Sequence, residues 1–141
     1  MNENINFTPY FASPIYTASL PELAKDLNKA SNKFIKESKN AAKKTIEKNQ
    51  KFYKKKIGDF GLSFHSLSLI NEPEFNQLKM YVERRSTEIL DHMGYDLSNY
   101  QLKWTEFWVQ EFAKNGGGHH DGHVHYDNHI SGFYFLKCSE K

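Results

Sequence analysis

The chain has little of what secreted or membrane-spanning proteins use. It contains one cysteine, Cys138, so no internal disulfide can form, which suits a reducing compartment. No apolar run approaches the roughly 18 residues that a membrane-spanning helix needs. The N-terminal sequence MNENINFTPYF also lacks the basic and then apolar pattern of a secretory signal. We therefore expect a cytoplasmic protein with no membrane segment.

Neither the length nor the composition indicates several domains or a disordered chain. The 141 residues are 38% hydrophobic and 15% aromatic, which is enough to build one hydrophobic core. We predict a single domain over residues 1–141.

Arginine is scarce, whereas lysine is concentrated in one segment. Twelve of the nineteen basic residues lie between Lys25 and Lys56, against four acids from Glu22 to Glu47. Such a segment could contact nucleic acid or another polyanion. We favour a solvated helix face instead, because the segment lacks the arginines and most of the aromatic residues that nucleic-acid sites commonly use.

The spacing of apolar residues predicts helices first and strands afterwards. Helical spacing begins after Pro21 and returns from Phe75 to Met93, where Gly94 is placed to end a helix. We predict a helical region over about residues 20–94 and a β region over about residues 101–137, which is rich in β-branched and aromatic residues. This order indicates an α+β fold in which helices pack on an antiparallel sheet.

The most unusual stretch is GGGHHDGHVHYDNHISGFYFL, residues 116–136, which holds five of the seven histidines. If residues 119–129 run extended, alternate side chains share one face. Every group on one such face can bind a metal ion: His119, Asp121, His123, His125, Asp127 and His129. Imidazole and carboxylate are ligands that first-row divalent ions prefer, so the stretch predicts a metal site.

Two overlapping ligand pairs lie in this stretch, His123 with His125 and His125 with Asp127. Residues two apart on a strand lie about 6 to 7 Å apart at the backbone and on one side of it, so both can reach one ion. A third ligand from a neighbouring strand would leave open positions, as in non-heme Fe(II) oxygenases. A closed zinc site is less favoured because it usually draws on cysteine. A His-rich surface turn that binds metal adventitiously is the alternative.

Five short pieces occur in an order and spacing that extend from about residue 7 to the C-terminus. They are FASPIY at 11–16, EPEFNQL at 72–78, Gly94-Tyr95, FWV at 107–109 and HVHYDNHISGFYF at 123–135, of which the last is the most specific. Together they resemble the 2-oxoglutarate- and Fe(II)-dependent oxygenases of the prolyl-4-hydroxylase-like superfamily, particularly a group found in phages and bacteria.

The resemblance implies a double-stranded β-helix, or jelly roll, with the N-terminal helices packed on its sheet. It also implies an Fe(II) centre that hydroxylates a substrate with 2-oxoglutarate and O2. The metal ligands would come from His123, His125 and Asp127, as either the His123/His125 or the His125/Asp127 pair. We assign cofactor binding to Trp108, Gln110 and Tyr134.

The chain departs from the family pattern in its third metal ligand. The family uses a later histidine followed by an Arg or Lys that binds 2-oxoglutarate. This chain has no histidine after His129, and its two arginines lie in the second predicted helix. We therefore expect an incomplete barrel and the N-terminal portion of a longer enzyme, in which His119 or His129 could substitute as a ligand. The alternatives are a non-catalytic jelly-roll module that binds a metal or a partner, and a cupin-like metalloenzyme of other chemistry.

Overall fold

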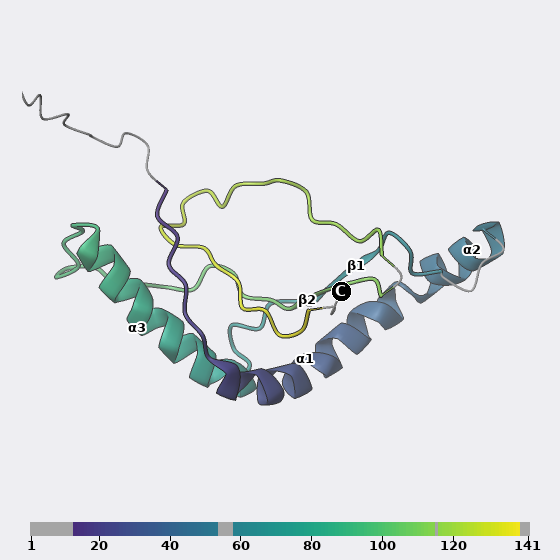
Figure 1. Cartoon of the computed structure of the whole chain (residues 1–141), viewed down its shortest axis with the longest axis horizontal. Helices are drawn as coiled ribbons and strands as arrows, with labels where there is room; N and C mark the ends of the chain where they lie inside the picture. Colours follow the sequence, from purple (N-terminus) through teal and green to yellow (C-terminus); the bar gives the residue numbers. More distant parts are fainter. Residues whose placement is uncertain (1–12, 54–57, 115, 139–141) are drawn as a thin grey trace, which may run out of the picture.

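The structure, a computed structural model, describes residues 13–53, 58–114 and 116–138. Its helices are α1 (Pro21–Ala41), α2 (Lys43–Tyr53), the 3-10 helix η1 (Pro73–Phe75) and α3 (Asn76–His92), and its strands are β1 (Ser63–His65) and β2 (Gln110–Phe112). In Figure 1, α1 and α3 form a V below the two strands, and the segment from residue 116 to residue 130, here called the arch, passes over their other side. The strands therefore lie between the helices and the arch.

Helix α1 organises the hydrophobic core. Its buried residues Leu23, Leu27, Ser31 and Ile35 recur every four positions and so form one stripe along the helix. Pro21 occupies the first turn, where its missing N–H would have no helical partner. The helix ends at Ala41, and α2 begins after Ala42.

The core consists of two clusters that α1 joins. The larger cluster packs α1 against η1, α3 and the loop after β1, through Leu23, Leu27, Leu69, Phe75 and Leu78. The smaller cluster packs α1 against the strand region, through Ile35, Phe64 and Ala113. Both α3 and the strands are thus positioned by contacts with the same helix.

The two strands pair antiparallel, with Phe64 opposite Glu111 and His65 opposite Gln110. The pairing continues beyond the strands, because the Ser66 N–H donates to the Val109 carbonyl at 3.0 Å and the Leu69 N–H to the Phe107 carbonyl at 2.7 Å. Phe107 and Val109 pack on the core. The alternate side chains, Glu106 and Trp108, therefore point toward the arch.

The predicted double-stranded β-helix is wrong for the described residues. The strands there are β1 and β2, each three residues long, and no jelly roll is evident. The sequence over 119–137 has the alternating side-chain pattern of a strand. The one backbone hydrogen bond within this segment, however, closes a turn, in which the Asn128 N–H donates to the His125 carbonyl. A strand needs a neighbour for its N–H and C=O groups, and the alternation of side chains does not supply one.

The backbone of the arch turns where a strand would run straight. Asp127 has a φ of 61°, the left-handed region that interrupts an extended chain, and Gly116 and Gly117 also have positive φ. The predicted β region over 101–137 therefore contributes β2 and an irregular arch in place of a barrel.

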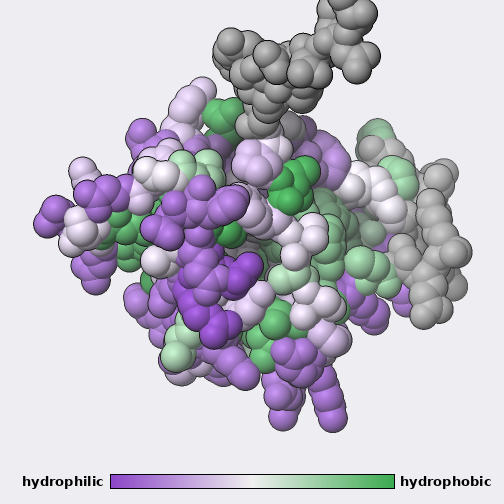
Figure 2. Space-filling view, turned by 60° about the vertical axis from the view of Figure 1, so that its left-hand side comes forward, coloured by the Kyte–Doolittle hydropathy of each residue, from purple (hydrophilic) through white to green (hydrophobic). Residues whose placement is uncertain are grey.

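Lysines of α1 and α2 face solvent, and two of them form ion pairs. Lys33 lies 2.8 Å from Glu74 and 3.6 Å from Glu72, and Lys39 pairs with Glu111. Hydrophilic residues cover much of the face seen in Figure 2, with apolar residues between them. Lys54–Lys56 of the basic segment and the first two residues of the FASPIY piece lie outside the described residues.

A separate observation concerns membranes. Among the helices in the described part of the chain, none is long and apolar enough to cross one.

Candidate metal centre

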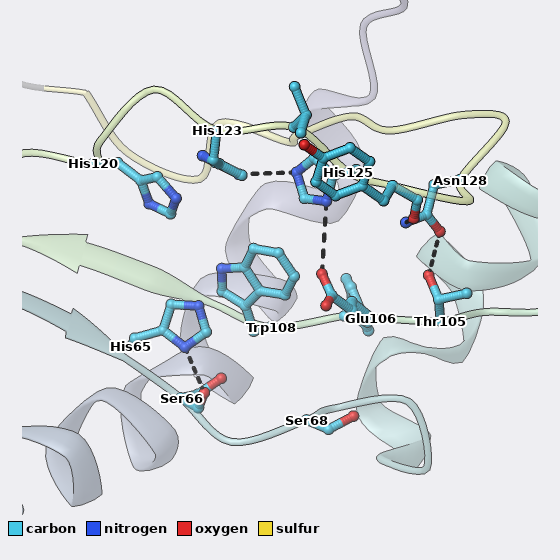
Figure 3. A pocket seen from close by; sticks show the side chains of 13 residues that line it. His65, Ser66, Ser68, Thr105, Glu106, Trp108, His120, His123, His125 and Asn128 are labelled. Atoms are coloured by element: carbon cyan, nitrogen blue, oxygen red, sulfur yellow. Dashed lines mark hydrogen bonds and ion pairs between the residues drawn. The ribbon is translucent and has the colours of Figure 1, made fainter.

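A pocket of about 620 Å³ lies between the strands and the arch (Figure 3). On its strand side the lining residues come from the end of β1, the loop after β1 and the residues before β2. On its arch side they include imidazoles. The residues used below are His65, Glu106, Trp108, His120, His123 and His125. The pocket thus brings together histidines that lie up to 60 residues apart in the sequence.

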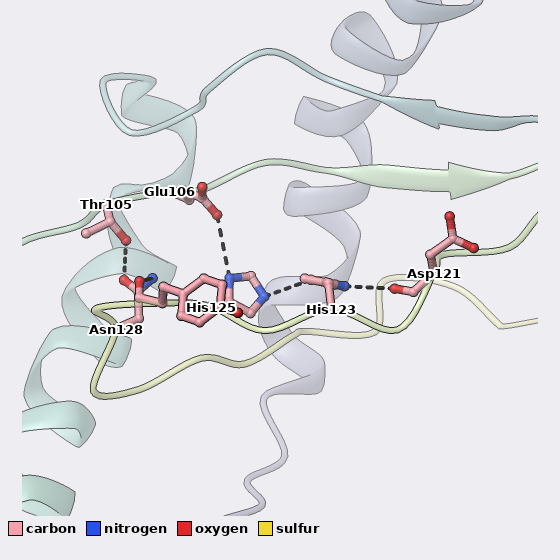
Figure 4. Close-up of polar contacts among 7 residues, drawn as sticks. Thr105, Glu106, Asp121, His123, His125 and Asn128 are labelled. Atoms are coloured by element: carbon pink, nitrogen blue, oxygen red, sulfur yellow. Dashed lines mark hydrogen bonds and ion pairs between the residues drawn. The ribbon is translucent and has the colours of Figure 1, made fainter.

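The centre of the pocket is a pair of facing imidazoles. Nε2 of His123 lies 3.0 Å from Nε2 of His125. On the far side of each ring, Nδ1 of His123 lies 2.9 Å from the Asp121 carbonyl oxygen, and Nδ1 of His125 lies 3.6 Å from Oε2 of Glu106 (Figure 4). A carbonyl oxygen can only accept, so Nδ1 of His123 presents its hydrogen to the Asp121 carbonyl, and its Nε2 carries a lone pair that faces Nε2 of His125. The separation between Nδ1 of His125 and Glu106 is that of an ion pair and is longer than a hydrogen bond.

Two arrangements account for this distance. Either Nε2 of His125 carries its ring hydrogen and donates it to Nε2 of His123, or a metal ion accepts electrons from both nitrogens. Two nitrogens that occupy neighbouring positions of an octahedral ion, each about 2.1 Å from it, lie about 3.0 Å apart. The spacing of the pair therefore fits two ligands of one six-coordinate ion.

Glu106 and Trp108 hold the His125 ring. The Glu106 carboxylate faces Nδ1, an arrangement that fixes the tautomer of metal-binding histidines and makes their other nitrogen more basic. The Trp108 indole lies 6.2 Å from the His125 ring and 4.9 Å from the His65 ring, at interplanar angles of 23° and 28°. His125 is the less exposed member of the pair, with 28% of its side chain accessible.

The residues predicted as ligands are not all in this pocket. His123 and His125 are brought together, whereas Asp127 lies at the turn and lines a separate hollow with Asn128 and His129. The structure thus favours the His123/His125 pair over the His125/Asp127 pair.

The two predicted substitute ligands also lie elsewhere. His119 pairs with Asp121 at 3.3 Å between Nε2 and Oδ1. The His129 ring packs edge-on against Tyr95 with a centroid distance of 5.5 Å. The expected single face from His119 to His129 is therefore divided among three places.

The residues predicted to bind the cofactor have different surroundings. Trp108 lines the pocket, and Gln110 accepts a hydrogen bond from Nδ1 of His120 at 2.9 Å. The Tyr134 hydroxyl donates to the Leu20 carbonyl at 2.5 Å, and the ring packs on the larger core cluster. Tyr134 thus connects the C-terminal segment to the start of α1.

Three of the six pocket residues used above were not among the sequence-predicted site residues: His65, Glu106 and His120. Glu106 could have been found, because it shares a strand face with Trp108 and Gln110. His65 could be placed only after β1 was paired with β2. His120 was expected on the opposite face from His123, yet their rings lie 4.4 Å apart because the backbone between them is not extended.

The pocket fits a metal ion better than it fits 2-oxoglutarate. Imidazole nitrogens are suitable ligands for Fe(II), although no group of three or more His, Cys, Asp or Glu among the described residues is already arranged around one point. A dicarboxylate is normally bound by cationic side chains. The described residues that line the pocket include no Lys or Arg, so this lining supplies no cationic partner for a carboxylate of 2-oxoglutarate.

The site is therefore a two-imidazole pair with a carboxylate behind one ring and an indole beside it. No protein-family model, curated protein or solved structure matches this chain.

Proposed function

We propose that this protein binds a divalent first-row transition-metal ion through the Nε2 atoms of His123 and His125. The observation that carries the proposal is the 3.0 Å approach of two nitrogens whose rings both turn Nδ1 toward an acceptor. A cation bound beside the two nitrogens would form a coordinate bond with each of them.

We further propose that the ion is Fe(II) and that the protein is a cytoplasmic oxygenase that hydroxylates an organic substrate with O2 and 2-oxoglutarate. This finer proposal is supported by the sequence resemblance and by the suitability of imidazole as an iron ligand. The pocket lining supplies no cation for 2-oxoglutarate, so the sequence resemblance alone supports this co-substrate. A bound Fe(II) ion would activate O2 for the oxidation of the substrate.

The residues of the chain have separate tasks in this proposal. His123 and His125 hold the ion, and the Glu106 carboxylate faces Nδ1 of His125 and orients its ring. Thr105 donates a hydrogen bond of 2.5 Å to Oδ1 of Asn128, which joins the arch to the strand side next to the pocket. Both residues line the pocket, so this contact joins its two sides close to Glu106 and His125.

Isothermal titration of the full chain with Zn(II) tests the metal site. We expect His125→Ala to weaken binding by at least about 100-fold, since the pair then has one ligand. The matched control is His129→Ala, which removes an imidazole from the same arch without touching the pocket. Equal Zn(II) affinity in wild type and in His125→Ala would contradict the proposal.

Succinate formation tests the oxygenase proposal separately. The chain is incubated with Fe(II), ascorbate and 2-oxoglutarate, and turnover is expected in wild type and not in His125→Ala. Metal binding without turnover would favour the second candidate function, a non-catalytic metal-binding module. The observation that favours this candidate is that the described pocket lining has no Lys or Arg side chain.

A further inference from the structure

The two facing imidazoles leave a bound ion short of protein ligands. Metal sites that retain an open position commonly have three protein ligands. Among the described residues, no third His, Cys, Asp or Glu already completes the set. The third ligand must therefore come from a side chain that lies close to the pair and can turn toward it.

The obvious candidates are excluded by their positions. Asp127 and His129 line a different hollow, and His119 is paired with Asp121. Glu106 lies behind His125, on the Nδ1 side, away from the facing nitrogens. His65 is separated from His125 by the Trp108 indole, which stacks with both rings (Figure 3).

The geometry points to His120 as the third protein ligand, an inference that rests on the proposed metal function. The His120 ring lies 4.4 Å from the His123 ring, measured between centroids, and lines the same pocket. Its Nδ1 donates to Oε1 of Gln110 at 2.9 Å. Since Nδ1 carries the hydrogen, Nε2 has a lone pair available for a metal. His120, His123 and His125 then share one tautomer, with Nδ1 held by an acceptor and Nε2 as the donor to the ion.

The required movement is confined to the His120 side chain. His120 now lies beside His123 with an interplanar angle of 40°, so its ring must rotate to direct Nε2 at the ion. The side chain is exposed, and Gly122, in the chain between the two histidines, has nothing within 4 Å of the position a Cβ would take. Neither the core nor the strand pairing has to change.

Three neutral imidazoles would give the site a distinct ligand preference. They leave the full +2 charge of the ion uncompensated by its protein ligands, whereas a site with a carboxylate ligand neutralises part of that charge. The open positions therefore favour an anionic oxygen ligand, such as a carboxylate or hydroxide, which can bind the ion without help from Lys or Arg.

The test compares Zn(II) affinity in four forms of the full chain: wild type, His120→Ala, His119→Ala and His123→Ala. We expect His120→Ala to weaken binding at least tenfold, His123→Ala to weaken it further, and the neighbouring His119→Ala to leave it unchanged. Co(II) provides a second measurement, because its visible absorption reports the ligand set: the spectrum of His120→Ala should differ from that of wild type, and that of His119→Ala should not.

The outcomes separate the two proposals. Unchanged affinity and spectrum in His120→Ala, with weakened binding in His123→Ala, would overturn the role of His120 and leave the His123–His125 site intact. Unchanged binding in both variants would overturn the metal site itself. His120→Gln provides a second substitution that retains a polar side chain beside Gln110, and circular dichroism checks that every variant is folded.

Discussion

At the scale of single residues, the orientation of His125 depends on Glu106. The carboxylate lies 3.6 Å from Nδ1 and is 57% exposed, so it adds little stability, and we expect it to act through the orientation and basicity of the ring. The same role is filled for His123 by a backbone carbonyl, which no substitution can remove.

We therefore expect Glu106→Gln to weaken Zn(II) binding by about tenfold, because the neutral amide makes the imidazole less basic. The free energy of unfolding of the metal-free protein should change little. Glu111→Gln, a substitution in β2 at a residue that pairs with Lys39 outside the pocket, is the control. Identical affinities for both variants would show that Glu106 does not act through His125.

Tyr134 provides the opposite case, a residue predicted to bind a cofactor whose hydroxyl instead contacts Leu20. Tyr134→Phe removes that hydrogen bond and should lower the free energy of unfolding by about 1 kcal/mol. Chemical denaturation measures this loss, and metal affinity should not change. If Tyr134→Phe instead weakened metal or 2-oxoglutarate binding and left the stability unchanged, Tyr134 would have a role in ligand binding.

Much of the site could be predicted from the sequence, and the remainder depends on backbone geometry. His123 and His125 lie close together, as their separation of two residues in the sequence predicts. The position of Asp127 does not, because its positive φ turns the chain away from the pocket. Glu106, His65 and His120 join the site through strand pairing and loop shape, which single-sequence patterns do not specify.

At the scale of elements, α1 and η1 are connected by both packing and charge. Lys33 of α1 donates to Glu74 of η1 at 2.8 Å, and Phe34 of α1 contacts Phe75 of η1, with ring centroids 6.0 Å apart. The hydrogen bond from Lys33 lowers the pKa of Glu74, and the bond to Glu74 raises the pKa of Lys33. Both groups are exposed, so the contribution is small and screened by salt.

The direction of the pH dependence follows from these shifts. Because the pKa of Glu74 is lowered in the folded protein, its contribution is present at neutral pH and is lost as the pH falls through that folded pKa. The contribution of Lys33 is lost only in strong base, as the pH rises through its raised pKa. Urea unfolding should find Glu74→Gln less stable than wild type at neutral pH and equally stable in strong acid. A difference of the same size in acid would exclude this ion pair as its cause.

Helices were more predictable than strands for a physical reason. A helix satisfies its backbone hydrogen bonds within itself, so the helical spacing of apolar residues from Leu23 onward indicates a helix there, although not the break between α1 and α2 at Ala42. Gly94 follows α3 with a φ of 87°, as its position after the apolar stripe predicts. A strand depends on a distant partner, and the segment from 119 to 137 does not acquire one within the described residues.

At the scale of the whole molecule, the layers are helices, a two-stranded sheet and the arch (Figure 1). The C-terminal segment still alternates: Tyr134 and Leu136 pack on the core, while Phe133 and Phe135 are 86% and 72% exposed. An apolar pattern on both faces predicts a strand that is buried on both sides. In this segment, however, only the face with Tyr134 and Leu136 packs against the rest of the protein. The metal proposal is compatible with this simpler fold, because its ligands come from one short loop and are oriented by β2 and the residues before it.

The most direct test is to measure the nitrogen resonances of the histidine rings by long-range proton–nitrogen NMR, before and after adding one equivalent of Zn(II). We predict that the Nε2 signals of His123 and His125 shift on binding while their Nδ1 atoms stay protonated, and that the ring signals of His129 do not move. Unchanged Nε2 signals for His123 and His125, or coordination through Nδ1, would contradict a metal ion bound between the facing nitrogens.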